Sequence, residues 1–111
     1  SAVCAAPPAK PKSKPAAGAK LPKFLELGAA WCGACQSMKP VIDDIKKEYK
    51  GKVDFQYIDV DKDKDAAKKY NVQAIPVQVF FDKTGKQVYS HVGIMSKGEI
   101  RKQFTKMKIK K

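Results

Sequence analysis

Two cysteines, Cys32 and Cys35, stand three positions apart in the segment GAAWCGACQSMKP, beside the only tryptophan of the chain, Trp31. Two thiols at this spacing can bind a metal ion, form a permanent disulfide, or exchange disulfides with another molecule. The segment leads from an apolar strand pattern into a helical one, so Cys32 is expected at a helix N-terminus. Unpaired N–H groups and the helix dipole favour an anion there, which makes Cys32 the expected thiolate and attacking group.

Disulfide exchange fits this pair better than the two alternatives. Cys35, one helical turn further on, can reach back to Cys32 and release a substrate from a mixed disulfide. A zinc site usually has four ligands, and the chain adds only Cys4 and the single histidine, His91. A permanent disulfide across so short a loop would restrict the unfolded chain little. The pair is therefore interpreted as a redox reagent, and no metal is expected.

Hydrophobic periodicity predicts the elements that position the two thiols. KFLELGAA (23–30) has the composition of a short buried strand, and apolar residues at helical spacing follow the second cysteine as far as Tyr49. Further strands are predicted in VDFQYIDVD (53–61), PVQVFFD (76–82) and KQVYSHV (86–92), and further helices in DKDAAKKY (63–70) and SKGEIRKQFTKM (96–107). The order strand, helix, strand, helix, strand, strand, helix predicts an α/β fold whose four-stranded mixed sheet carries helices on both faces.

The two ends of the chain differ in composition from its middle. Residues 1–20 are rich in alanine, proline and lysine and are predicted to be a disordered tether, residues 21–107 one domain, and residues 108–111 a basic tail. Eight lysines in the first 20 and last six residues account for most of the net charge of +12. These ends lack interleaved aromatic residues, and no apolar run is long enough to span a bilayer. Neither nucleic acid binding nor an integral membrane segment is expected.

The segment AAWCGACQSMKP resembles the active-site segment of the thioredoxin family. Similar segments follow in the same order in YIDVD, YNVQAIPVQVFFDKTGK and VGIMSKGEI, so the resemblance covers residues 23–104. It implies the thioredoxin fold, with the first strand and helix of the full-length family replaced here by the tether. It also implies a monomeric protein disulfide reductase whose substrates are protein disulfides and whose redox group is its own Cys32–Cys35 disulfide, without a further cofactor.

The resemblance implies roles for individual residues. Cys32 corresponds to the nucleophile and Cys35 to the resolving thiol. Pro76 corresponds to the cis-proline that faces the disulfide, and it leaves the backbone of the preceding residue free to pair with a substrate strand. The implied substrate-binding residues are Trp31, Gly33, Ala34, Ile75, Pro76 and Gly93. Plain packing is an alternative role for the tryptophan, and a turn conformation is an alternative for the last glycine.

Glu26 is a carboxylate inside the apolar run FLEL. Helices on both faces of the sheet should cover it, and burial raises a carboxyl pKa, so Glu26 is a candidate proton acceptor for Cys35. Thioredoxin has an aspartate at the matching position, and exported thioredoxin-like reductases often have a glutamate. Tyr57 replaces a lysine that thioredoxin has near the buried acid, so proton handling is expected to differ. The alternative is a Glu26 at a partly open edge of the sheet, with its carboxylate in water.

Two other classes of function are compatible with the same sequence. A disulfide oxidase or isomerase has the same fold, although Ile75 and the absence of a histidine between the thiols argue against it. The dipeptide Gly33-Ala34 replaces the glycine-proline of thioredoxin and leaves the reduction potential open. A non-catalytic binding module with basic tails is the third reading, and such binding would persist after both cysteines are replaced.

The tether favours a location outside the cytoplasm, in the periplasm or another extracytoplasmic compartment. The segment VCAAPPA has the small residues of a signal-peptide cleavage site, and Cys4 could also be a lipid-attachment site or a remnant of cloning. An exported protein would receive electrons from a membrane thiol–disulfide carrier. A cytoplasmic location is the alternative, with a flavin-dependent thioredoxin reductase as the electron donor.

Overall fold

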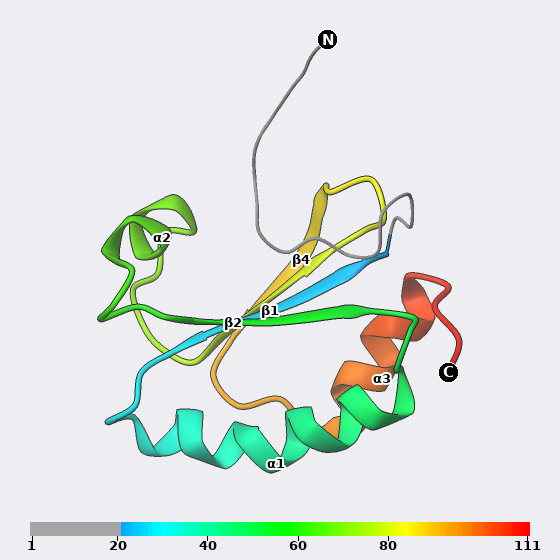
Figure 1. Ribbon diagram of the computed structural model, residues 1–111, viewed down its shortest axis with the longest axis horizontal. Coiled ribbons are helices and arrows are strands. Elements are labelled where there is room, and N and C mark those ends of the chain that lie inside the picture. The colour runs from blue at the N-terminus through cyan, green and yellow to red at the C-terminus, as the bar shows by residue number, and fades with distance from the viewer. Residues whose placement is uncertain (1–20) are drawn as a thin grey trace, which may run out of the picture.

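The computed structural model describes residues 21–111. The expectations for residues 1–20, namely the disordered tether, the export signal and the roles of Cys4, lie outside the described residues. Seven elements follow one another in the predicted order (Figure 1): β1 (Lys23–Gly28), α1 (Gly33–Glu48), β2 (Asp54–Asp59), α2 (Lys64–Lys69), β3 (Val77–Phe81), β4 (Gln87–Val92) and α3 (Lys97–Lys106). Over the described range, none of the helices is long and apolar enough to cross a membrane.

The four strands form one mixed sheet in the order β2-β1-β3-β4. β1 and β2 are parallel because α1 carries the chain across one face of the sheet between them (Figure 1). β3 runs antiparallel to both of its neighbours, β1 and β4. The predicted fold class is confirmed, and β1 occupies a central position in which helices cover both of its faces.

The alternation of side chains along β1 decides which layer each residue joins. Phe24 packs with residues of α1 and α3, and its ring centroid lies 5.1 Å from that of Phe80 and 6.3 Å from that of Phe104. Leu25 and Leu27 point to the opposite face and pack with residues of α2 and β3. By the same alternation Glu26 lies on the Phe24 face, beneath α1.

The N-terminus of α3 is fixed by the capping box that its sequence predicts. The Ser96 hydroxyl accepts a hydrogen bond from the Glu99 N–H at 3.1 Å, and the Glu99 carboxylate accepts one from the Ser96 N–H at 2.8 Å. One turn further on, both guanidinium contacts of Arg101 reach the carboxylate of Glu48 on α1, at 2.8 and 2.6 Å. The two helices are thus aligned side by side on one face of the sheet.

The C-terminus of α3 ends in a left-handed turn at Lys108, whose φ is +63°. Its N–H donates to the Thr105 carbonyl and the Ile109 N–H donates to the Phe104 carbonyl, which is the hydrogen-bond pattern of a Schellman motif. The turn brings Ile109 back against the core cluster that contains Phe104. Part of the segment predicted as a basic tail therefore packs on the domain.

Replacing Lys108 with glycine should stabilise the protein by about 1 kcal/mol, because a left-handed conformation strains every residue that has a Cβ. Urea unfolding of Lys108→Gly beside wild type measures the gain. Lys110→Gly is the matched control, since Lys110 has no positive φ and its replacement should leave the midpoint unchanged or lower. An equal gain in both variants would show that the loss of charge, and not backbone strain, is responsible.

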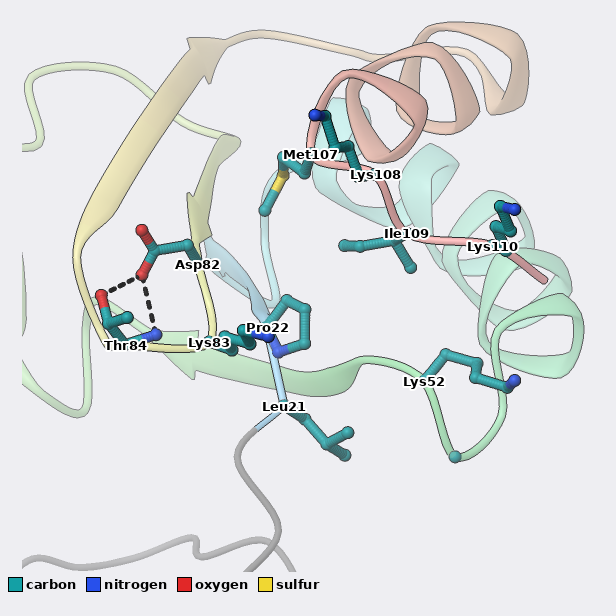
Figure 2. Close-up of a pocket in the computed structure, with 11 residues that line it drawn as sticks. Leu21, Pro22, Lys52, Asp82, Lys83, Thr84, Met107, Lys108, Ile109 and Lys110 are labelled. Atoms are coloured by element: carbon teal, nitrogen blue, oxygen red, sulfur yellow. Dashed lines mark hydrogen bonds between the residues drawn. The ribbon is translucent and has the colours of Figure 1, made fainter.

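A surface pocket of about 620 Å³ lies between the start of β1, the residues after α1, the β3–β4 turn and the end of the chain. Figure 2 shows Pro22, Met107 and Ile109 around its centre, with Lys52 and Lys110 at its edge. This pocket lies near the C-terminal end of α1, a helix of 16 residues and thus about 24 Å long. The thiols lie at the other end of that helix, so the pocket is separate from the site described next.

Candidate functional site

Cys32 and Cys35 lie at the start of α1, just after the loop that connects it to β1. Cys32 is the N-cap residue of α1, and its sulfur accepts a hydrogen bond from the Cys35 N–H at 3.2 Å. The position at a helix N-terminus is the one that the sequence predicts. Both residues are free thiols and are buried, with 7% and 4% of their surfaces exposed. A partner must therefore dock closely before it can reach either sulfur.

The environment of Cys35 opposes its ionisation. Burial is the main cause that raises the pKa of this thiol to about 11, and the hydrogen bond with Cys32 adds to it. The negative charges of Cys32 and Glu26 raise it further, and a backbone hydrogen bond at Ala29 opposes them in part. Cys35 consequently needs a nearby base if it is to act as a nucleophile near neutral pH.

Glu26 supplies a carboxyl group that can serve as this base. It is 2% exposed, so the alternative of a carboxylate in water at an open edge is wrong. Burial raises its pKa to about 7, although a hydrogen bond that Oε1 accepts from Gln78 Nε2 at 3.1 Å lowers it in part. Oε2 has no hydrogen-bond partner among residues 21–111. The negative charge of Glu26 contributes to the raised pKa of Cys35, so the two groups are close enough to interact.

Tyr57 and Gly28 complete the surroundings of the Cys35 sulfur. A Cβ added at Gly28 would lie 2.9 Å from Cys35 Sγ and 3.4 Å from the Tyr57 hydroxyl. Tyr57 is half exposed, and its pKa is raised by burial first and then by the charges of Asp59, Cys35 and other acidic groups. The residue that replaces the family lysine therefore places a neutral hydroxyl beside the resolving thiol.

Gly28→Ala should destabilise the domain by about 1–3 kcal/mol and slow the exchange reaction, because the new methyl group would displace the Cys35 sulfur. Thermal unfolding and the rate of insulin reduction measure the two effects. Gly98→Ala is the control for adding a methyl group, since a Cβ at Gly98 on α3 would make only an ordinary contact, at 3.9 Å from Ser96 Oγ. Equal effects in the two variants would rule out the close contact at Gly28 as their cause.

A smaller pocket of about 220 Å³ leads from the surface to Glu26. It lies between α1 and β2 and is lined by Glu26, Lys39, Ile42, Asp43, Lys46, Phe55, Gln56 and Tyr57. The pocket gives the buried carboxyl group a route by which it can exchange a proton with solvent, without passing through the thiols.

Trp31 lies at the surface beside the thiols and is 72% exposed. Its indole N–H donates a hydrogen bond to Asp61 Oδ2 at 2.5 Å, so plain packing does not account for this residue. Asp61 was not among the predicted site residues. The hydrogen bond fixes an exposed aromatic ring next to the nucleophile, where contact with a partner would cover it.

Another part of the site contains Ile75, Pro76 and Gly93. The Ile75–Pro76 peptide bond is cis, and the Pro76 carbonyl accepts a hydrogen bond from the Gly93 N–H at 2.7 Å. Ile75 packs against the cluster that contains both thiols. Gly93 has a φ of +104°, so the turn conformation is enough to explain why a glycine is present. The space around its Cβ position is open. A substrate-binding role for these residues stays a prediction.

The other two predicted residues lie in the first turn of α1. Ala34 is half-buried and packs against the thiol cluster, whereas Gly33 is exposed. Among residues 21–111 no group of three or more histidine, cysteine, aspartate or glutamate side chains is arranged to bind a metal ion.

Sequence reasoning missed Gln78, which is fully buried at 0% exposure and bonded to Glu26. Its signal is the same as that of Glu26, since a polar residue interrupts the apolar run VQVFF as glutamate interrupts FLEL. Pairing of the two strands would have placed them opposite each other. Gly28 gave no signal of its own, because its role depends on where α1 places the Cys35 sulfur.

Comparison with known proteins gives one family. The family model described as Thioredoxin matches residues 17–106. The chain is 33% identical over 89 residues to the chloroplastic M-type thioredoxin of Pisum sativum, covering 80% of this chain and 51% of that protein. It is 34% identical over 80 residues to the thioredoxin of Rickettsia felis, covering 72% and 75%. The chain thus spans about half the length of the plant relative and three quarters of the bacterial one.

Solved structures agree with the family model. The X-ray structure of the thioredoxin of Fasciola hepatica superposes with a TM-score of 0.72 at 32% identity, covering 79% of this chain and 82% of that one. The bacterial relatives include the thioredoxin of Pseudomonas aeruginosa, which is 33% identical over 79 residues, covering 71% of this chain and 72% of that protein. These similarities and the adjacent buried thiols together support thiol–disulfide exchange as the chemistry of the site.

Proposed function

This chain belongs to the thioredoxin family, and from that premise we propose that it is a protein disulfide reductase. Cys32 attacks a disulfide of a partner protein, one partner sulfur leaves as a thiol, and a mixed disulfide forms. Cys35 then attacks the sulfur of Cys32. The second partner thiol leaves. The partner has gained two electrons, and the two thiols of this chain have lost them and form the Cys32–Cys35 disulfide.

One observation carries the direction of this reaction. The charges that act on Cys35 are those of Cys32 and Glu26, and both are negative, so they and burial raise the pKa of this thiol to about 11. A strong oxidant is one whose reduced form is stabilised. No positively charged group is among the causes that act on Cys35, so the site offers no such stabilisation of this thiol in its ionised form, which supports reduction of partners.

The proposed docking surface joins Trp31, beside the thiols, with the segment that contains Ile75, Pro76 and Gly93. The N–H and C=O of Ile75 have no backbone hydrogen-bond partner within residues 21–111, and they can pair with an extended segment of the partner. The exposed ring of Trp31 and the exposed side chains of Val92 and Ile94, on either side of Gly93, would then be covered. Such a surface is suited to an unfolded or loop segment that carries a disulfide.

Equilibration with glutathione buffers, followed by Trp31 fluorescence in a Cys4→Ser background, tests the proposal. A potential near that of a reducing thioredoxin, about −270 mV, is expected. A value near −120 mV would contradict a reductase and indicate an oxidase or isomerase. Loss of activity in a variant that lacks both Cys32 and Cys35 separates either enzyme from a binding module.

The cellular partners extend this proposal. We propose that the protein is located outside the cytoplasm and receives electrons from a membrane thiol–disulfide carrier; the composition of residues 1–20 supports this location. Fractionation of cells and trapping of mixed disulfides with a Cys35→Ser variant would identify the compartment and the donor. Recovery of a cytoplasmic flavin-dependent reductase would support the alternative.

A further inference from the structure

Glu26 and Gln78 are opposite each other in the centre of the sheet. They are register partners on the antiparallel strands β1 and β3, and strand alternation places both side chains on the face beneath α1. Glu26 is 2% exposed and Gln78 is 0% exposed. A buried glutamine in a strand is costly unless its polar atoms are used, so its presence in the middle of the core requires an explanation.

The hydrogen bonds of this pair are incomplete in a specific way. Gln78 Nε2 donates to Glu26 Oε1 at 3.1 Å, while Glu26 Oε2 and Gln78 Oε1 have no partner among the described residues. An apolar residue at position 78 would avoid the cost of an unpartnered amide oxygen. The one hydrogen bond that the amide makes among residues 21–111 is with the carboxyl group, so this bond is what the glutamine contributes.

Among the described residues, Gln78 is the only hydrogen-bond partner of the Glu26 carboxyl group. Cys35 and the pocket-lining residues Lys39, Asp43 and Lys46 face it from α1, and Tyr57 faces it from β2. None of them makes a hydrogen bond with the Glu26 carboxyl group in the described part of the chain. The position and the charge state of this carboxyl group therefore depend on the amide across the sheet.

We propose that Gln78 is a positioning residue that holds Glu26 Oε1 and thereby leaves Oε2 as the atom that takes the proton of Cys35. The inference rests on the proposed function, because it assigns a proton path to the second step of that reaction. When Cys35 attacks Cys32, its S–H bond breaks and the proton passes to Oε2. The disulfide bond forms as the bond to the partner sulfur breaks, and the partner leaves as a thiolate.

Removal of the Gln78 amide should raise the pKa of Glu26. The donor on Oε1 stabilises the carboxylate, so Gln78→Leu should raise the midpoint of the Glu26 titration by about one pH unit. At pH 7 the fraction of molecules with a usable base then falls several-fold. Above the new midpoint the fraction of molecules with an ionised Glu26 recovers. The rate at which Cys35 transfers its proton and releases the partner then recovers as well.

The experiment follows two readouts in the whole chain, the first of them with both thiols reduced. The first is the titration of Glu26 by ¹³C NMR of glutamate-labelled protein, with Glu26→Gln identifying the resonance. The second is the pH profile of the single-turnover release of a thiol from a mixed disulfide at Cys32. Gln87→Leu is the matched control, since Gln87 is an exposed strand glutamine on β4, which does not pair with β1.

An upward shift of both midpoints in Gln78→Leu supports the proposal if it is absent in Gln87→Leu and absent from the rate profile in a Glu26→Gln background. An unchanged or lowered midpoint with a folded protein would overturn it and leave Gln78 a packing residue. Gln78→Met, which retains the length of the side chain, replaces the leucine variant if that one does not fold. The NMR midpoint needs no substrate, so it is measured independently of whether the protein reduces partners.

Discussion

Replacing Glu26 with glutamine is expected to stabilise the protein by about 3 kcal/mol above pH 8 and to have little effect near pH 4. Burial raises the pKa of this carboxyl group from its usual 4.5 to about 7 in the folded state. Between those two pH values the folded chain binds a proton that the unfolded chain has released, so the stability of wild type falls as the pH rises. Each unit of pKa difference corresponds to about 1.4 kcal/mol.

The Glu26→Gln variant removes the charge and retains an oxygen that can accept from Gln78. Urea unfolding at intervals from pH 4 to pH 9 should give a falling stability for wild type and a flatter profile for the variant. Asp43→Asn removes an exposed carboxylate from α1 and should change the unfolding free energy by less than about 0.5 kcal/mol. Parallel profiles for wild type and Glu26→Gln would mean that Glu26 has the same pKa in the folded and the unfolded protein.

Loss of Cys35 should convert a turnover catalyst into a trap. In Cys35→Ser the Cys32 sulfur can still form a mixed disulfide, but no second thiol is present one turn away to release it. Turnover in an insulin reduction assay is expected to fall on the order of 100-fold or more, while a covalent complex with the partner accumulates. Non-reducing gel electrophoresis or intact mass measurement detects that complex directly.

Cys32→Ser separates the roles of the two thiols. It should lose the same activity and form no mixed disulfide, because Cys35 is 4% exposed and its pKa is raised, mainly by burial. Cys4→Ser should retain full activity if Cys4 has no part in the exchange. A complex formed by Cys32→Ser, through Cys35, would reverse the assignment of attacking and resolving thiol.

The strongest inferences from the sequence concern features that are local along the chain. Cys32 and Cys35 are three residues apart, so the helix that contains them is sufficient to place one sulfur at the N-cap and the other a turn later. The capping box at Ser96 and Glu99 is likewise a contact between residues within one turn. The alternation of FLEL predicts the burial of Glu26 once helices are expected on both faces of the sheet.

Contacts between distant residues could only be decided by the tertiary structure. Gln78 is 52 residues from Glu26, and the Trp31–Asp61 bond joins residues 30 apart. The contact of Gly28 with the Cys35 sulfur depends on the angle at which α1 leaves β1. The thiol pair, the order of elements and the buried acid could be predicted from the sequence, because periodicity and short-range spacing encode them. The partner of that acid required the register of β1 with β3, which only the packing of the whole sheet establishes.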